Sequence, residues 1–186
     1  MESILKQGKN MELKTGDIIF TSKESIIVRF MRLFQKDPVF WGHVLIAKDN
    51  ETAWEAGPVL RETDIKWKLL KESSWKIIRK KDLTEHQKEI MKKVAPKLLG
   101  QPYSISRIIL QLLDHVFDTN GFTMIFGNKY SQVCSSYVAW IYWVACKHKF
   151  NGVEWQSCDP DDIEDDQINN PNLWEIITTY GKQREM

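Results

Sequence analysis

The sequence predicts a single-domain α+β fold in which an antiparallel sheet packs against helices. Three observations predict it. Short apolar runs separated by turn residues fill the first half of the chain. Helical periodicity dominates the second half. The run 133–146 is apolar nearly all round, which predicts a helix buried against the sheet. With 186 residues and no internal repeat or low-complexity linker, one domain spanning 1–186 is the simplest organisation.

Strands are predicted where a short apolar run is bounded by turn residues. Gly16 and Asp17 precede the first run, and Gly57 with Pro58 ends the third. The predicted strands are 18–20, 44–47, 52–56, 59–65, 75–79 and 173–177.

Helices are predicted from the 3.6-residue spacing of apolar side chains at 25–34, 84–99, 104–117 and 133–146. Thr84 suits an N-cap and Gly100 a helix stop, whereas Pro96 should kink the helix or end it early. Asp159 followed by Pro160 predicts the start of a short acidic helix.

Composition excludes several classes of function. The formal net charge of +1 gives no field that favours nucleic acid. Three cysteines without paired spacing make a poor disulfide framework and favour a reducing compartment. We find no signal-peptide pattern and no apolar run of membrane-spanning length, so we expect a cytoplasmic protein without a membrane span. The sequence calls for no cofactor and leaves the oligomeric state open.

Cys134 is the best-placed nucleophile among the cysteines. It begins the most apolar predicted helix, where the helix dipole favours a thiolate and unpaired N–H groups are available to an oxyanion. Cys146 closes the same helix at its unfavourable end, and Cys158 lies beside several aspartates. A cysteine at a helix start is more often structural than catalytic, so position alone leaves both roles open.

His43 is the best candidate for the base. It begins a buried strand, where a polar residue is unexpected, although a hydrogen-bonded histidine at a strand end is an equally good reading. His86 and His115 fall on polar helix faces. His148 follows the buried helix among lysines, where it would complement the carbonyl end.

Glu55 is the candidate for the acid that orients this base, because it is a carboxylate inside an apolar strand. If the hairpin loop is 48–50, His43 lies opposite Glu55 on one face, and Asn50 suits the left-handed position of the loop. A two-residue loop at 49–50 would put Glu55 on the other face. The alternative is an edge-strand carboxylate that faces water.

The order His43, Glu55, Cys134 resembles the permuted NlpC/P60 cysteine hydrolases of the YiiX/YebB type, within the papain-like superfamily. The matching stretches run through most of the chain and are fairly specific in order and spacing: LKTGDIIF from 13, GHVLI from 42, WEA from 54, GQPY from 100, VCSSYV from 133 and DPDDI from 159. Ser104 departs from the pattern, which has aspartate there.

The resemblance implies a permuted papain-like fold with Cys134 as nucleophile, His43 as base and Glu55 as orienting acid. It implies a thiol hydrolase acting on amide bonds of peptidoglycan-type or other peptides through a thioester. The nearest alternative is a lipid acyl hydrolase or acyltransferase of the related permuted type. Tyr103 and Trp41 are the expected substrate contacts, with a small peptide or acyl lipid as substrate.

Two further classes stay open. A non-catalytic binding module on this fold would usually lack one member of the triad, and all three are present here. A serine enzyme using Ser135 or Ser136 would place its nucleophile one or two positions inside the helix, which is less suited to an oxyanion hole. No CxxC or HxxxH spacing supports a zinc site, so we expect no metal.

Overall fold

The computed structural model describes residues 12–22, 41–57, 59–101 and 134–183. The elements in chain order are β1 (Ile18–Thr21), β2 (His43–Ala47), β3 (Thr52–Ala56), β4 (Leu60–Asp64), α3 (Ile65–Leu69), β5 (Trp75–Lys80), α4 (Glu85–Val94), η1 (Ala95–Leu98), α7 (Cys134–Cys146), η2 (Phe150–Gly152), α8 (Pro160–Asn169) and β6 (Trp174–Tyr180).

The strands form one six-stranded sheet in the order β4-β3-β2-β1-β5-β6, and each neighbouring pair is antiparallel. β1 lies near the middle, between β2 and β5, so its apolar side chains are covered on both faces. The predicted α+β class with an antiparallel sheet is therefore confirmed.

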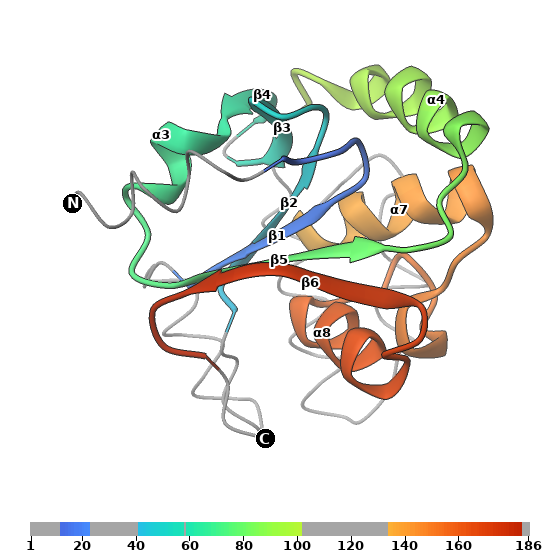
Figure 1. The fold of residues 1–186 in the computed structure, drawn as a ribbon. Coiled ribbons are helices and arrows are strands. Elements are labelled where there is room, and N and C mark those ends of the chain that lie inside the picture. The colour runs from blue at the N-terminus through green and yellow to red at the C-terminus, as the bar shows by residue number, and fades with distance from the viewer. Residues whose placement is uncertain (1–11, 23–40, 58, 102–133, 184–186) are drawn as a thin grey trace.

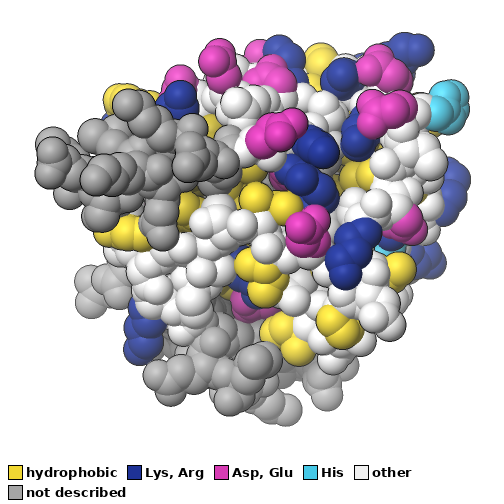
Figure 2. Space-filling view, viewed as in Figure 1, with side chains coloured by type: hydrophobic (Ala, Val, Ile, Leu, Met, Phe, Trp, Pro, Cys, Tyr) yellow, Lys and Arg dark blue, Asp and Glu magenta, His cyan; other side chains and the backbone are white. Residues whose placement is uncertain are grey.

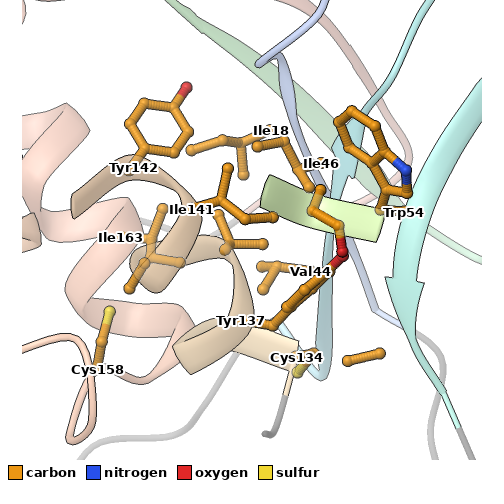
Figure 3. Close-up of a cluster of buried hydrophobic side chains, with 14 of the residues drawn as sticks. Ile18, Val44, Ile46, Trp54, Cys134, Tyr137, Ile141, Tyr142, Cys158 and Ile163 are labelled. Carbon is orange, nitrogen blue, oxygen red and sulfur yellow. The ribbon is translucent and has the colours of Figure 1, made fainter. Parts of the chain in front are cut away.

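The two faces of the sheet carry two separate apolar clusters, because successive side chains of a strand alternate between faces. Ile18, Val44 and Ile46 pack with Ile141 and Tyr142 of α7, as Figure 3 shows. The other face packs side chains of the same strands against Ile65 and Leu69 of α3. Figure 1 accordingly shows α3 and α7 on different sides of the strands.

The turn before β1 is fixed by an ion pair whose carboxylate is buried. Gly16 has a φ of +96°, which favours glycine, and a Cβ there would lie 2.8 Å from Leu83 Cδ1. Asp17 then accepts from Arg79 Nε at 2.8 Å and Nη2 at 2.7 Å. Tyr142 of α7 donates to the Gly16 carbonyl at 2.5 Å. The Gly-Asp motif therefore ties the first strand to β5 and to the buried helix.

The helix signals of the sequence are confirmed where the structure describes them. Thr84 caps α4 through a capping box with Gln87. The α-helical turns stop at Val94, and Pro96 lies in the 3₁₀ turn η1 that follows. Asp159 caps α8 in the same way, and α7 covers the range predicted for the buried helix to within one residue.

One helix was not anticipated. The strand predicted at 59–65 ends one residue early, because Asp64 accepts a hydrogen bond from the Trp67 amide and starts α3 at Ile65. The predicted helices at 25–34 and 104–117 lie outside the described residues.

The surface mixes charges of both signs. Figure 2 shows lysine and arginine side chains interspersed with acidic ones on the face viewed there. Ion pairs such as Lys88–Glu85 and Lys92–Glu89 account for part of this pattern on α4. Within the described ranges, none of the helices combines the length and apolarity that a membrane crossing requires.

Candidate functional site

His43 stands at the first residue of β2, opposite Thr21 of β1. The four residues that follow it are buried, so the strand is anchored in the core while its first side chain keeps 18% of its surface exposed. His43 therefore combines a fixed backbone with a side chain at the edge of the core. This suits a group that must meet both a buried partner and a substrate.

Glu55 lies on the same face as His43, but not directly opposite it. The observed register pairs Leu45 with Glu55 and Ala47 with Ala53. The predicted pairing of His43 with Glu55 is therefore wrong by two residues. The prediction that the two side chains share a face is confirmed. They meet diagonally, with His43 Nε2 3.1 Å from Glu55 Oε1.

The register differs because the hairpin loop starts later than predicted. Lys48 donates its backbone N–H to the Thr52 carbonyl, which leaves 49–51 as the loop. Asp49 closes it by accepting from the amides of Glu51 and Thr52. Asn50 is not among the residues with positive φ, contrary to expectation; its side chain accepts from the Leu13 amide.

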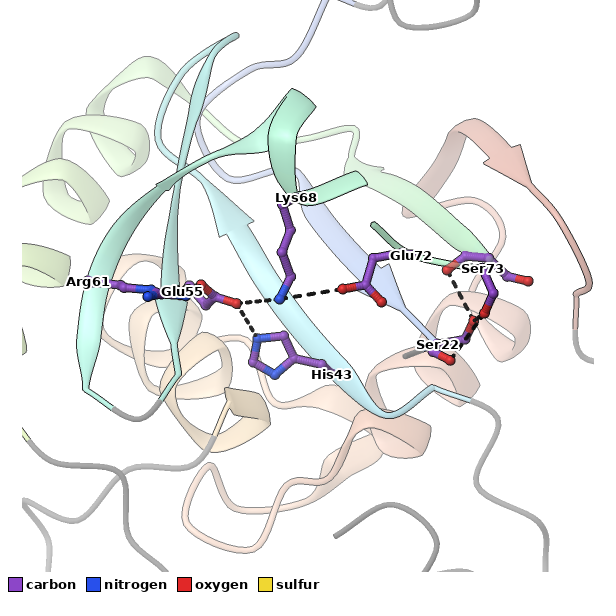
Figure 4. Close-up of polar contacts among 8 residues, drawn as sticks. Ser22, His43, Glu55, Arg61, Lys68, Glu72 and Ser73 are labelled. Carbon is purple, nitrogen blue, oxygen red and sulfur yellow. Dashed lines mark hydrogen bonds and ion pairs between the residues drawn. The ribbon is translucent and has the colours of Figure 1, made fainter. Parts of the chain in front are cut away.

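Glu55 is held on both carboxylate oxygens. Oε2 accepts from Arg61 Nε at 3.1 Å and Nη2 at 3.0 Å, and Oε1 accepts from Lys68 Nζ at 2.6 Å as well as meeting His43. The carboxylate is only 2% exposed. Burial alone would raise the pKa of Glu55, but the bonds and charges of His43 and Lys68 hold it well below its usual range. Glu55 is therefore a fixed anion (Figure 4).

Cys134 begins α7 with its side chain against the start of β2, and the residue is 6% exposed. Burial alone would raise the pKa of the thiol, but the charge of His43 and a hydrogen bond to it outweigh burial. The backbone N–H groups of Val44 and Ser135 also stabilise the thiolate. The net effect is a Cys134 pKa below that of an ordinary thiol.

His43 shows the reciprocal change. Burial alone would lower its pKa, but the Cys134 charge and the hydrogen bonds to Cys134 and Glu55 raise it to about 9. A lowered thiol pKa beside a raised imidazole pKa favours the thiolate–imidazolium pair over the neutral pair. With Nε2 directed at Glu55, Nδ1 is the nitrogen left to Cys134. The geometry thus brings together a thiol of lowered pKa, an imidazole of raised pKa and a fixed carboxylate.

The other cysteines lack these features. Burial, and secondarily the charges of Asp162 and Asp159, raises the pKa of Cys158 well above that of an ordinary thiol. Burial also raises the pKa of Cys146. Ser135, an alternative nucleophile, is buried and donates its hydroxyl to the Cys158 carbonyl at 2.8 Å. Ser136 is fully buried in α7.

The remaining predicted site residues have different surroundings. Trp41 is fully buried, with its ring 5.5 Å from that of Phe20, so a role in contacting substrate stays a prediction. Tyr103 lies outside the described residues, as does His115. His86 is exposed on α4. His148 donates its Nε2–H to Asp166 of α8 at 2.8 Å, so it links the end of α7 to α8 and does more than cap α7.

Sequence reasoning missed Arg61 and Lys68. Arg61 could have been predicted, because β3 and β4 are consecutive strands and Arg61 lies directly opposite Glu55. Lys68 was not, since it belongs to the five-residue helix α3, whose short lysine-rich stretch gives no clear periodic signal. Both residues act on the carboxylate and through it on His43.

The comparisons with known proteins bear on the fold. No protein-family model matches the sequence, and no curated protein matches it. Among solved structures, the crystal structure of the metalloprotein YiiX from Escherichia coli O157:H7, DUF1105, is similar to this chain. The two share 18% sequence identity at a TM-score of 0.58, over 92% of this chain and 98% of that chain. The likeness is one of fold, and this chain therefore has a YiiX-like fold.

Proposed function

We propose that this protein is a cysteine hydrolase of the permuted papain-like type that cleaves an amide bond through a thioester. The observation that carries the proposal is the linked set Cys134, His43 and Glu55, in which the thiol pKa is lowered and the imidazole pKa is raised. An activated thiolate beside a fixed imidazole is the arrangement that covalent acyl transfer requires.

The proposed reaction starts from the resting pair, in which the Cys134 proton already lies on His43. The thiolate attacks the carbonyl carbon, and the oxyanion is stabilised by the Cys134 backbone N–H at the positive end of α7. The C–N bond breaks, and the departing amine takes its proton from the His43 imidazolium. His43 then removes a proton from water, which attacks the thioester and releases a carboxylic acid. The Cys134 thiolate leaves and the resting pair is restored.

Glu55 serves this cycle as a fixed anion. Because its pKa lies well below neutral pH, it stays ionised and keeps His43 oriented without competing for the proton. Arg61 binds the carboxylate on two nitrogens, a geometry that fixes the plane of the carboxylate.

A metal-dependent reaction is not supported by the residues at this site, although the YiiX structure is that of a metalloprotein. Glu55 is the carboxylate that bonds to His43 among the described residues, and both of its oxygens are occupied by cationic side chains, which would repel a metal ion. Among the described residues, there is no group of three or more histidine, cysteine or acidic side chains that suits a metal. We therefore derive no step through a metal.

The test is the pH dependence of iodoacetamide alkylation at each cysteine, followed by mass spectrometry. We expect Cys134 to label fastest, with a midpoint well below the ~8.5 of an unperturbed thiol, and His43→Ala to abolish the advantage. His148→Ala is a matched control, because His148 is similarly buried and also meets a carboxylate. Its labelling profile should be that of the wild type.

If Cys134 labels no faster than Cys158, or if His43→Ala changes nothing, the proposal fails and a binding module becomes the better interpretation. If labelling is selective, peptides and acyl lipids are screened with Cys134→Ala as the blank. Cleavage of peptides alone supports the amide hydrolase. Turnover of acyl lipids alone replaces it with a lipid acyl enzyme.

A further inference from the structure

One oxygen of Glu55 serves two donors. Oε1 lies 2.6 Å from Lys68 Nζ and 3.1 Å from His43 Nε2, whereas Oε2 is taken by Arg61. The nearer partner of Oε1 is therefore the lysine. Figure 4 shows Lys68 descending from α3 toward the same carboxylate that His43 approaches from β2. The acid that orients the base is thus shared with a cation.

Lys68 also bridges to a second buried carboxylate. Its Nζ is 3.5 Å from Glu72 Oε1, and the Glu72 side chain is 1% exposed. Among the described residues, Glu72 Oε2 has no hydrogen-bond partner. Lys68 is therefore the cation that compensates Glu72, and this second attachment holds the ammonium between two anions. Its position is set by α3 and the segment that follows, independently of His43.

A cation at this position has a defined effect on His43. The ammonium offsets part of the negative potential that Oε1 exerts on the imidazole, and it repels an imidazolium directly. The charge of Lys68 therefore lowers the pKa of His43, against the larger upward effect of Cys134. Among the described residues, the charged groups around His43 are Cys134 of α7, Glu55 of β3 and Lys68 of α3, with Arg61 and Glu72 behind them. Lys68 is the cation that lies on the oxygen bonded to His43.

We propose that Lys68 is a positioning residue of the hydrolase proposed above, and that by sharing Glu55 Oε1 it keeps His43 able to give its proton to the departing amine. Without the lysine, the Oε1 atom of Glu55 would bond to His43 alone and hold the imidazolium more tightly. Acylation would still begin, because the thiolate would form, but proton delivery to the leaving group would be slower. This inference rests on the proposed function and assigns α3 a part in the same site.

The experiment titrates His43 by NMR, using protein labelled at histidine Cε1, with His43→Ala to assign its signal among the four histidines. Lys68→Met removes the charge and keeps much of the length. We expect it to raise the His43 pKa by about one unit, whereas Lys68→Arg restores the wild-type value to within a few tenths. Glu72→Gln should shift the pKa in the opposite direction, because Lys68 then acts on the Glu55 oxygen with its charge uncompensated.

A second variant guards against misfolding. Lys68→Met leaves Glu72 buried without its cation, which is costly. The double variant Lys68→Met/Glu72→Gln removes one charge of each sign, and its His43 pKa should still rise, by less than in the single variant. A purely structural lysine would loosen the site in every variant and could not produce shifts of opposite sign.

The outcomes separate the two proposals. Opposite shifts in Lys68→Met and Glu72→Gln, with rescue by Lys68→Arg, support the positioning role. An unchanged His43 pKa in Lys68→Met and in the double variant, with Cys134 labelling still dependent on His43, overturns the inference and leaves the hydrolase standing. Unselective labelling of Cys134 in the wild type overturns the hydrolase and the inference with it.

Discussion

Replacing Glu55 with glutamine tests the origin of the His43 charge. Glu55→Gln keeps the shape of the side chain and an oxygen acceptor but removes the negative charge that His43 Nε2 approaches at 3.1 Å. The imidazolium loses a charge-assisted partner while Arg61 and Lys68 remain. The His43 pKa should therefore fall, the opposite of the change expected for Lys68→Met.

The magnitude follows from the order of the contributions. The pKa of His43 is about 9, against an ordinary value of 6.5. The charge and hydrogen bond of Cys134 contribute more to this rise than the bond to Glu55 does. Loss of one charge-assisted bond, worth about 1.4 kcal/mol, corresponds to a decrease of about one unit. The thiolate is then less well stabilised, so alkylation of Cys134 on the acidic side of its midpoint should slow by up to about tenfold.

The assay combines histidine NMR titration with the alkylation profile of Cys134 and urea denaturation. Because Arg61 is 51% exposed and keeps its hydration, we expect a stability loss of only about 2 kcal/mol. A His43 pKa that stays near the wild-type value in a folded Glu55→Gln variant would refute the reasoning. It would mean that Cys134 alone sets the charge of the imidazole.

Three further predictions concern stability. Asp166→Asn should lower the free energy of unfolding by about 2–3 kcal/mol in urea denaturation, because Asp166 is a buried acceptor for His148. Cys134 should still label at the wild-type rate, and altered labelling would contradict the separation of the His148–Asp166 pair from the Cys134 site. Thr84→Ala removes the capping box with Gln87 and should cost about 1 kcal/mol; an unchanged urea midpoint would argue against the cap. The pKa values of Glu55 and Asp166 both lie below their ordinary range. Each carboxylate therefore stabilises the fold at pH values above its pKa in the unfolded chain, and this stabilisation is lost as the pH falls toward its pKa in the folded protein. The free energy of unfolding should therefore decrease on acidification from pH 7 to pH 3.5, and less steeply in Asp166→Asn than in the wild type.

Much of the fold could be predicted from local sequence patterns. The caps at Thr84 and Asp159, the stop after Val94 and the apolar run of α7 are decided by residues within a turn or two of each other. Such features depend on short-range hydrogen bonds and on side-chain periodicity, both of which can be read along the chain. The helix-start position of Cys134 belongs to this group.

The meeting of His43 with Glu55 was only partly local. Any loop with an odd number of residues puts the two side chains on one face, so parity could be predicted. The register could not be predicted, because loops at 48–50 and at 49–51 both have an odd number of residues. The hydrogen bonds that the Asp49 side chain accepts select the second loop. The side chains still meet, since diagonal neighbours on one face remain within reach.

By itself, the sequence determined the sheet-forming runs, the capped helices, the position of Cys134 at a helix start and the shared face of His43 and Glu55. The tertiary structure alone decided which charges act on them. Lys68 and Glu72 are ordinary charged residues in the sequence, but the packing of α3 brings Lys68 to Glu55, and Glu72 pairs with the same lysine. The effect of a charge depends on distance and burial. Those quantities exist only after segments far apart in the chain have packed together.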